Sequence, residues 1–163
     1  TKFYRDKTRW AFTLQMAILQ SMVKTRRAID NHPRPLKDDL VFVERSPVSS
    51  TAFVQNSFDL GYLSGAEFDL YLSYASLLAW SPDVFILLEA PLATCLSRIR
   101  QRDRLGENGI DESYHSSLQV RYETLYMAED IAQRTIRIDT DTIGVDTLGQ
   151  EILRRVNVAA EAT

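Results

Sequence analysis

Apolar residues recur at helical spacing through the first thirty positions of the chain, and this pattern predicts a helix over residues 8–29. The apolar positions fall into two stripes, Trp10, Leu14, Ile18 and Met22 on one side and Phe12, Met16, Leu19 and Val23 on the other. A helix with two apolar stripes is expected to be largely buried. Pro33 and Pro35 end it, because a proline disfavours helical backbone at the residue before it.

Three short apolar runs predict β-strands over residues 40–43, 84–88 and 135–138. The first two runs are continuous rather than alternating, which is typical of strands covered on both faces. Helices are predicted between and after the strands, over residues 49–59, 64–80, 91–102, 111–133 and 148–158. Strands that alternate with helices predict an α/β fold, with a parallel sheet flanked by helices, in a single domain over residues 1–163.

Residue types at the helix ends support these bounds. Ser64 and Glu67 have the spacing of a capping box, Pro91 suits a first helical position, and Asp111 suits an N-cap. Residues 103–110 contain two glycines and are predicted to form a loop.

Composition and charge exclude several classes of function. The 163 residues include 19 basic and 22 acidic side chains, and this net charge of −3 disfavours a general nucleic-acid binder. No apolar run approaches the roughly 20 residues that cross a bilayer, and no leader opens the chain, so we expect no membrane association and a cytoplasmic protein. Cys95 is the only cysteine, which excludes an internal disulfide and a His/Cys zinc site.

The first candidate site is Glu44-Arg45-Ser46, directly after the predicted strand over residues 40–43. Open α/β sheets bind ligands outside the carboxyl ends of their strands. Glu44 would supply oxygen ligands to a magnesium ion, and Arg45 would hold an anionic or developing oxyanionic group. The alternative is a solvated turn, or a pair of opposite charges that closes the strand.

The second candidate is a run of alternating arginines, Arg98, Arg100, Arg102 and Arg104, which leads into the glycine-containing loop. Arg98 and Arg102 lie four residues apart and therefore share one helix face. Such a cationic segment could close over phosphates, with the glycines permitting the movement. The alternative is that cations gather at a helix C-terminus because of the helix dipole.

Other features are interpreted as structural. His115 is expected to be a surface or helix-packing residue, Cys95 a small buried apolar residue, and Tyr71 and Tyr74 core residues. No lysine follows a glycine, so the chain contains no G-x-x-x-x-G-K-S/T phosphate loop.

Four blocks of sequence, in order, resemble the deoxyribonucleoside kinases. Residues 4–15, YRDKTRWAFTLQ, are similar to the tyrosine, tryptophan and glutamine segment of that family. Glu44-Arg45-Ser46 is similar to its E-R-S motif, and residues 84–98 to its strand, proline and arginine-bearing helix. Arg102-Asp103-Arg104 with Glu107 looks like its lid. The resemblance implies a fold like that of P-loop kinases, incomplete at the N-terminus, and an activity that uses ATP and Mg²⁺.

The resemblance also implies roles for residues around the acceptor hydroxyl. Glu44 would coordinate magnesium, and Arg45 would contact the 5′-oxygen of the acceptor nucleoside. Tyr4 and Glu107 would bind the sugar 3′-hydroxyl. In the lid region three arginines would bind ATP, with the last two on the transferring phosphates: Arg98, Arg102 and Arg104.

Roles at the base follow in the same way. Gln15 would hydrogen-bond the base edge, while Trp10 and Leu14 would wall the pocket. Deoxycytidine-preferring relatives place a charged pair at positions that correspond to Met22 and to the residues shortly after E-R-S, among them Ser50. A neutral pocket with a methionine leaves room and apolar contact for a 5-methyl group. We therefore expect thymidine to be among the best substrates, with deoxycytidine or another pyrimidine as the alternative and deoxyguanosine poor.

The sequence thus predicts a deoxyribonucleoside kinase domain that lacks the first strand and the phosphate loop of the family. We expect the chain by itself to have little kinase activity, to bind a small-molecule deoxyribonucleoside, and to form a homodimer. A mitochondrial location stays open, because the N-terminal segment of the family is missing. Two alternative functions are a catalytically silent accessory subunit and a nucleoside monophosphate kinase.

Overall fold

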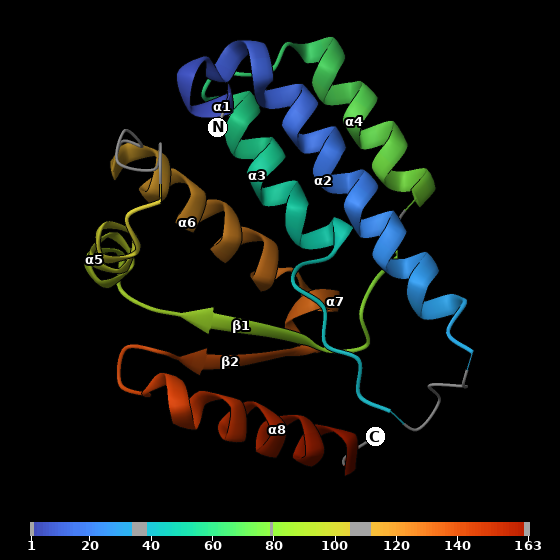
Figure 1. Cartoon of the computed structure of the whole chain (residues 1–163), viewed down its shortest axis with the longest axis vertical. Helices are drawn as coiled ribbons and strands as arrows, with labels where there is room; N and C mark the ends of the chain where they lie inside the picture. The colour runs from blue at the N-terminus through green and yellow to red at the C-terminus, as the bar shows by residue number, and fades with distance from the viewer. Residues whose placement is uncertain (1, 34–38, 79, 105–111, 162–163) are drawn as a thin grey trace. The chain divides into compact units, whose positions relative to one another are not determined.

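The computed structural model describes residues 2–33, 39–78, 80–104 and 112–161 of the chain. The chain forms two compact units, Thr1–Ser81 and Pro82–Thr163 (Figure 1). The described part of the first unit is helical, and the second unit contains the sheet. No helix in these ranges is long and apolar enough to span a membrane.

The described residues of the first unit form helices α1 (Lys2–Arg5), α2 (Lys7–Asp30), α3 (Pro47–Asp59) and α4 (Gly65–Leu78). Helix α2 packs against both α3 and α4. Its N-cap is Asp6, whose carboxylate accepts a hydrogen bond from the amide of Arg9 at 2.9 Å. This cap satisfies one of the amide groups that the first helical turn leaves without an internal partner, so α2 begins one residue earlier than predicted.

The core of the first unit is apolar and joins three helices with the α3–α4 connection: Ala11, Leu19, Val54, Leu63, Tyr71 and Ala75. On α2 the buried residues are Ala11, Gln15, Leu19 and Met22. The prediction that both apolar stripes of α2 are buried was therefore only partly right. Most of the bulky stripe residues are half-buried and lie on either side of the row formed by these four buried residues. The line between two apolar stripes points directly inward, so the small Ala11 and the polar Gln15 become buried.

Helices α3 and α4 both begin with a capping box. The Ser46 amide donates to Ser49 Oγ at 2.9 Å while the Ser49 amide donates to Ser46 Oγ at 3.3 Å, and α3 starts two residues before the predicted position. In α4 the predicted box is confirmed: the Ser64 amide donates to Glu67 Oε2 at 2.9 Å, and the Glu67 amide to Ser64 Oγ at 3.3 Å. The bond from the Ser64 backbone lowers the pKa of Glu67.

The predicted strand over residues 40–43 is not formed. The segment is irregular, and Leu40, Val41 and Phe42 are exposed. A strand is stable only when its backbone groups pair with a neighbouring strand, and the described part of the first unit contains none. The apolar composition of the run was therefore insufficient to produce a strand.

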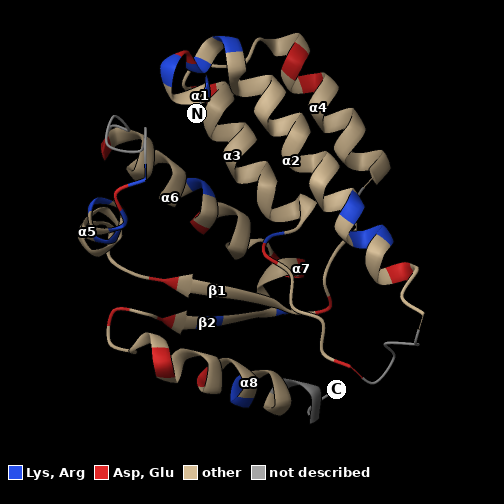
Figure 2. Ribbon diagram, in the orientation of Figure 1, with Lys and Arg blue, Asp and Glu red and all other residues tan. Residues whose placement is uncertain are grey.

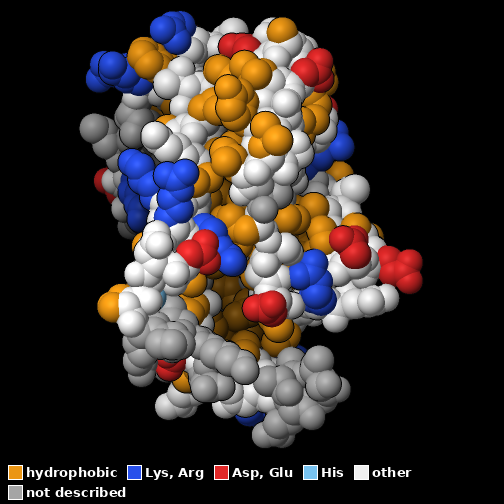
Figure 3. All heavy atoms as spheres, turned by 90° about the vertical axis from the view of Figure 1, so that its right-hand side faces the viewer, with side chains coloured by type: hydrophobic (Ala, Val, Ile, Leu, Met, Phe, Trp, Pro, Cys, Tyr) orange, Lys and Arg blue, Asp and Glu red, His pale blue; other side chains and the backbone are white. Residues whose placement is uncertain are grey.

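Tyr71 is a core residue as predicted, but Tyr74, also expected in the core, is exposed. A step of three residues turns the helix by about 300°, so Tyr74 points about 60° away from Tyr71 around the axis of α4, outside the buried side of the helix. Figure 3 shows hydrophobic side chains gathered over the helices of this unit. The exposed hydrophobic residues of α4 include Leu70 and Leu77.

The second unit contains a parallel pair of strands, β1 (Phe85–Glu89) and β2 (Thr135–Asp139), in register from Phe85↔Thr135 to Glu89↔Asp139. The prediction of a parallel sheet flanked by helices is confirmed. The expectation that the β1 run is covered on both faces was wrong in part, because Phe85 is buried and Leu88 is exposed.

In the described residues of the second unit these strands are accompanied by helices α5 (Leu92–Arg102), α6 (Glu112–Met127), α7 (Glu129–Ala132) and α8 (Val145–Glu161). Helix α8 runs beside β2, and α5 lies beyond the arrowheads of the strands (Figure 1). Pro91 is the N-cap of α5 rather than its first residue. Cys95 and His115 are half-buried, His115 with its ring edge-to-face to Tyr114.

The single helix predicted over residues 111–133 is two helices, because Ala128 is extended with ψ of 131° and serves as the N-cap of α7. No proline or glycine marks this break in the sequence. Asp111, the predicted cap of this helix, lies outside the described residues. Helix α8 begins three residues before the predicted start.

Candidate functional site

The structure brings together two of the residues predicted for the base pocket. Met22 lies on the buried face of α2, and Ser50 lies in the first turns of α3. The Ser50 hydroxyl donates a hydrogen bond to the Met22 sulfur at 3.6 Å, and the two residues are 1% and 7% exposed. A neutral hydroxyl and a thioether, both removed from solvent, therefore form one wall between these helices.

Gln15 shares the buried face of α2 with Met22, two helical turns earlier. It is only 3% exposed, and its Oε1 has no hydrogen-bond partner in the part of the chain that the structure describes. A buried acceptor without a donor costs about 1–3 kcal/mol. An unsatisfied carboxamide at this depth has the donor and acceptor chemistry to pair with a ligand.

Trp10 and Leu14 lie on the same helix and are half-buried. Two cations lie over the indole ring of Trp10, with Lys2 Nζ 4.6 Å and the Arg9 guanidinium carbon 4.5 Å from a ring centroid. The contacts combine the apolar body of the ring with electrostatic attraction at its face. Tyr4, on α1, is half-buried and stands edge-to-face against Phe3 with ring centroids 5.5 Å apart.

Glu44 and Arg45 stand at the amino-terminal end of α3, two residues and one residue before its N-cap Ser46. They follow an irregular segment rather than the strand that was expected. Both side chains are exposed, and no ion pair joins them within the described chain, so the interpretation as a closing charge pair is not supported.

Arg45 has a left-handed backbone, with φ of 65°. This conformation costs a non-glycine residue roughly 1–2 kcal/mol and persists where the surrounding structure enforces it. Its guanidinium carbon lies 4.3 Å from the ring centroid of Phe53, one and a half turns into α3. The aromatic face therefore holds the cation beside the start of α3, a contact that sequence reasoning missed because it depends on the fold of the turn.

Glu44 is the residue that was predicted to bind a magnesium ion. In the described ranges no group of three or more His, Cys, Asp or Glu side chains could hold a metal by itself. Magnesium keeps several water ligands and is usually bound through one or two carboxylates together with substrate phosphates. A single exposed carboxylate such as Glu44 fits that mode, in which the ion arrives with the nucleotide.

The predicted nucleotide arginines lie in the second unit, on and after α5 (Figure 2). Arg102 is the last residue of α5, and Arg104 follows the C-cap Asp103, which has φ of 43°. Arg102 and Arg104 are exposed. Arg100 and Arg102 occupy the last turn of α5, so the helix-dipole interpretation also applies to them. Glu107 lies outside the described residues.

Arg98 has defined partners. Its Nη1 donates to Thr140 Oγ1 at 3.0 Å, and its Nη2 donates to the Thr140 carbonyl at 2.6 Å. Thr140 directly follows β2, 42 residues along the chain, and nothing local in the sequence marks it as a partner.

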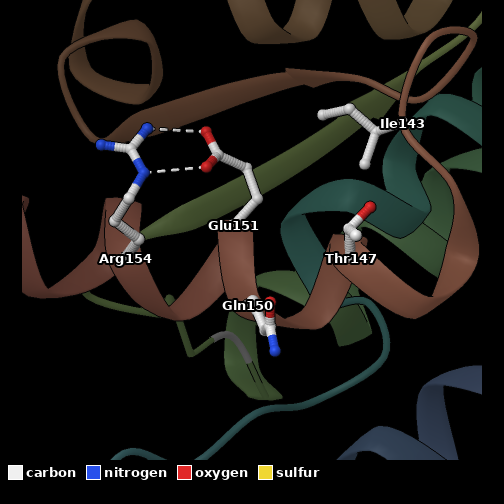
Figure 4. Close-up of a pocket in the computed structure, with 5 residues that line it drawn as sticks. All are labelled: Ile143, Thr147, Gln150, Glu151 and Arg154. Atoms are coloured by element: carbon white, nitrogen blue, oxygen red, sulfur yellow. Dashed lines mark hydrogen bonds and ion pairs between the residues drawn. The ribbon is translucent and has the colours of Figure 1, made fainter.

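A hollow of about 340 Å³ lies along α8 and contains none of the predicted site residues (Figure 4). It is lined by Ile143, Thr147, Gln150, Glu151 and Arg154. Glu151 and Arg154 point toward one another and form two hydrogen bonds, of 2.7 and 2.8 Å. The bonds from Arg154, with those from Arg155, lower the pKa of Glu151 to about 2. The charged groups of this hollow therefore compensate each other.

Comparison with known proteins gives a consistent set of relatives. Residues 1–160 match the family model described as deoxynucleoside kinase. The chain is 31% identical over 127 residues to a deoxyadenosine/deoxycytidine kinase of Bacillus subtilis, covering 75% of this chain and 57% of that protein. It is 32% identical over 134 residues to a thymidine kinase of Ictalurid herpesvirus 1, covering 78% of this chain and 54% of that protein.

Among solved structures, the deoxyadenosine kinase from M. mycoides with dCMP and dCDP bound superimposes with a TM-score of 0.82. The sequence identity is 23%, and the match covers 96% of this chain and 79% of that one. At this identity the similarity establishes the fold. The chain spans little more than half the length of the two curated relatives described above.

Proposed function

Because this chain belongs to the deoxynucleoside kinase family, we propose that the protein transfers the γ-phosphoryl group of ATP to the 5′-hydroxyl of a deoxyribonucleoside, with thymidine preferred. The observation that carries the proposal is the unsatisfied Oε1 of Gln15, buried on the same helix face as Met22. The N3–H group of thymine would donate to this oxygen, and the Gln15 amide would donate to O4 of the base. A pyrimidine edge would thus satisfy an acceptor that the protein leaves without a partner.

Base preference follows from the character of the neighbouring wall. Met22 offers apolar surface to a 5-methyl group, and because neither Met22 nor its partner Ser50 carries a charge, the wall offers no ionic partner to cytosine or a purine. The curated relatives include a deoxyadenosine/deoxycytidine kinase and a thymidine kinase, and their names alone favour no single base. The Met22–Ser50 contact is the reason for choosing thymidine, with deoxycytidine as the second substrate.

The acceptor hydroxyl would be oriented by residues at both ends of the sugar. Arg45, held over Phe53, would donate to the 5′-oxygen and stabilise the charge that develops there. Tyr4 and Glu107 would bind the 3′-hydroxyl. Glu44 would hold magnesium, which supplies charge neutralisation on the phosphates when it is bound with ATP.

ATP would be bound by Arg98, Arg102 and Arg104, with the last two on the transferring phosphates. Phosphoryl transfer needs positioning and neutralisation of charge more than covalent chemistry, and arginine provides both through its planar array of donors. The exposure of Arg102 and Arg104 supports this role, because a ligand can approach both side chains from solvent.

The test is a transfer assay with the full-length gene product, radiolabelled ATP and each of the four deoxyribonucleosides. We expect the highest kcat/KM for thymidine, a lower value for deoxycytidine and the lowest values for the purines. A preference for a purine would overturn the assignment of Met22 and Ser50 to the base pocket. Transfer to thymidine monophosphate but not to thymidine would instead identify a nucleoside monophosphate kinase, and absence of transfer to all of them would identify a silent subunit.

A further inference from the structure

Helix α5 is tied to the carboxyl ends of the two strands by hydrogen bonds that converge on Thr140. Arg98 donates to this residue twice, from Nη1 to Oγ1 at 3.0 Å and from Nη2 to the carbonyl at 2.6 Å. Thr140 is 8% exposed, whereas the Arg98 side chain is exposed. The guanidinium is therefore fixed by a buried partner while remaining accessible to solvent.

Thr140 is itself anchored to the neighbouring strand. Its amide donates to the carbonyl of Glu89, the last residue of β1, at 2.7 Å, and its hydroxyl donates to the same carbonyl at 2.9 Å. Because the hydroxyl has a single hydrogen, which points to Glu89, its oxygen lone pairs are left to accept from Arg98. The position of the guanidinium is thus set by both strands of the sheet.

The partners of Arg98 are electrically neutral. Within the described chain it makes no ion pair, and its two bonds go to a hydroxyl and a carbonyl oxygen. Two of its five N–H groups are occupied, and its positive charge is not compensated by a carboxylate. Arg137 differs in this respect, since it forms an ion pair with Glu89 on the adjacent strand. The contacts with Thr140 therefore orient Arg98 without compensating its positive charge, which remains available to an anion.

We propose that Thr140 is a positioning residue for ATP, which acts by holding the Arg98 guanidinium ready for the anionic nucleotide. This inference rests on the proposed function, which assigns Arg98 to the nucleotide. An unrestrained arginine loses side-chain freedom when it binds a ligand, whereas one that is already held in place loses less. The advantage applies to binding of ATP and not to binding of the nucleoside.

The test compares Thr140→Val with Thr140→Ser in the full-length gene product. Valine removes the hydroxyl at nearly constant volume, and the Glu89 carbonyl keeps its bond from the Thr140 amide. We expect Thr140→Val to raise the KM for ATP about tenfold, the effect of losing one hydrogen bond to a charged group. The KM for thymidine and kcat should change less than twofold, and Thr140→Ser should restore the KM for ATP. In an Arg98→Ala background, Thr140→Val should have no further effect.

Thr94→Val is the matched structural control. Thr94 lies one turn before Arg98 on α5, and its hydroxyl donates to Asp141 Oδ1 at 2.8 Å, so it joins the same two elements without touching the guanidinium. We expect Thr94→Val to lower thermal stability as Thr140→Val does, and to leave the KM for ATP unchanged. An equal rise in both variants, or no rise in Thr140→Val, would overturn the inference.

Direct titration with ATP separates this inference from the proposed function. A wild-type protein that binds ATP but phosphorylates no nucleoside would overturn the proposed function. In that case a loss of ATP affinity in Thr140→Val would still support the inference, and an unchanged ATP affinity would overturn it. A wild-type protein that does not bind ATP would overturn both.

Discussion

The Ser50 hydroxyl donates a hydrogen bond to the Met22 sulfur at 3.6 Å, across 28 positions of sequence. A thioether is a weak acceptor, so this hydrogen bond contributes little to stability. Its main effect is to orient the flexible Met22 side chain against the first turns of α3. Because both residues are buried, a change at either one alters the volume of this wall directly. Substitution at Met22 or Ser50 therefore tests whether this wall limits the size of a base that pairs with Gln15.

Truncation of Met22 should reduce the preference for a methylated base. Thymidine and deoxyuridine differ by the 5-methyl group, and burial of one such group is worth about 0.8 kcal/mol, or about fourfold in kcat/KM. We expect the wild-type protein to favour thymidine by about that factor and Met22→Ala to lose most of the difference. Met127→Ala is the control, since Met127 is exposed on α6. Unchanged discrimination in Met22→Ala would remove Met22 from the base pocket.

Glu44→Gln should lower turnover far more than nucleoside affinity. The substitution keeps the shape of the side chain and removes the negative charge that would hold magnesium. We expect kcat to fall about a hundredfold, as for loss of one preorganised charge-stabilising group, while the KM for thymidine changes less than threefold. Glu129→Gln, at an exposed carboxylate on α7, should retain wild-type turnover. If Glu44→Gln is equally active, Glu44 has no catalytic role.

Arg45→Gly should separate stability from activity. Glycine relieves the cost of a φ of 65°, roughly 1–2 kcal/mol, and this gain offsets the loss of the contact with Phe53. We therefore expect the free energy of unfolding to stay within about 1 kcal/mol of the wild-type value, whereas kcat falls at least tenfold. Urea unfolding and steady-state kinetics measure the two effects. Arg45→Lys retains charge without the planar donors, and full activity in that variant would show that only the charge matters.

The capping box of α4 should give a pH-dependent contribution to stability. Because the bonds from Ser64 lower the pKa of Glu67 below the ordinary 4.5, the folded state favours the carboxylate. The contribution is then complete above pH 4.5 and is lost as the pH falls through the lower folded value. We expect Glu67→Gln to be less stable than wild type at pH 7 by a few tenths of a kcal/mol, the order of a helix-terminus charge effect, and this difference to become smaller as the pH is lowered to 3. Urea unfolding at both values measures this.

Asp69→Asn is the comparison for that experiment. Asp69 lies on the same helix, and its side chain makes no hydrogen bond within the described chain. Its substitution should change stability less than Glu67→Gln does at pH 7. A difference in stability between wild type and Glu67→Gln that is as large at pH 3 as at pH 7 would show that the carboxylate charge is not what stabilises the box.

The sequence alone determined the class of fold and the positions of most elements. Helix α4 begins where Ser64 and Glu67 place it, and the runs at residues 84–88 and 135–138 form a parallel pair within one residue of the predicted bounds. These features depend on contacts within one helical turn or on the composition of a short run, so a short stretch of sequence is enough to predict them. The ordered motifs also identified the family.

Tertiary structure decided which predicted strands form and which residues contact each other, and local sequence patterns do not determine either. Residues 40–43 have the composition of a strand but no pairing partner in the described part of their unit, and Gln15 is buried because the line between two apolar stripes faces the core. The contacts of Met22 with Ser50 and of Arg98 with Thr140 join residues 28 and 42 positions apart. Such pairs exist only after helices and strands have packed, because the distance between two side chains on different elements is set by packing and not by sequence spacing.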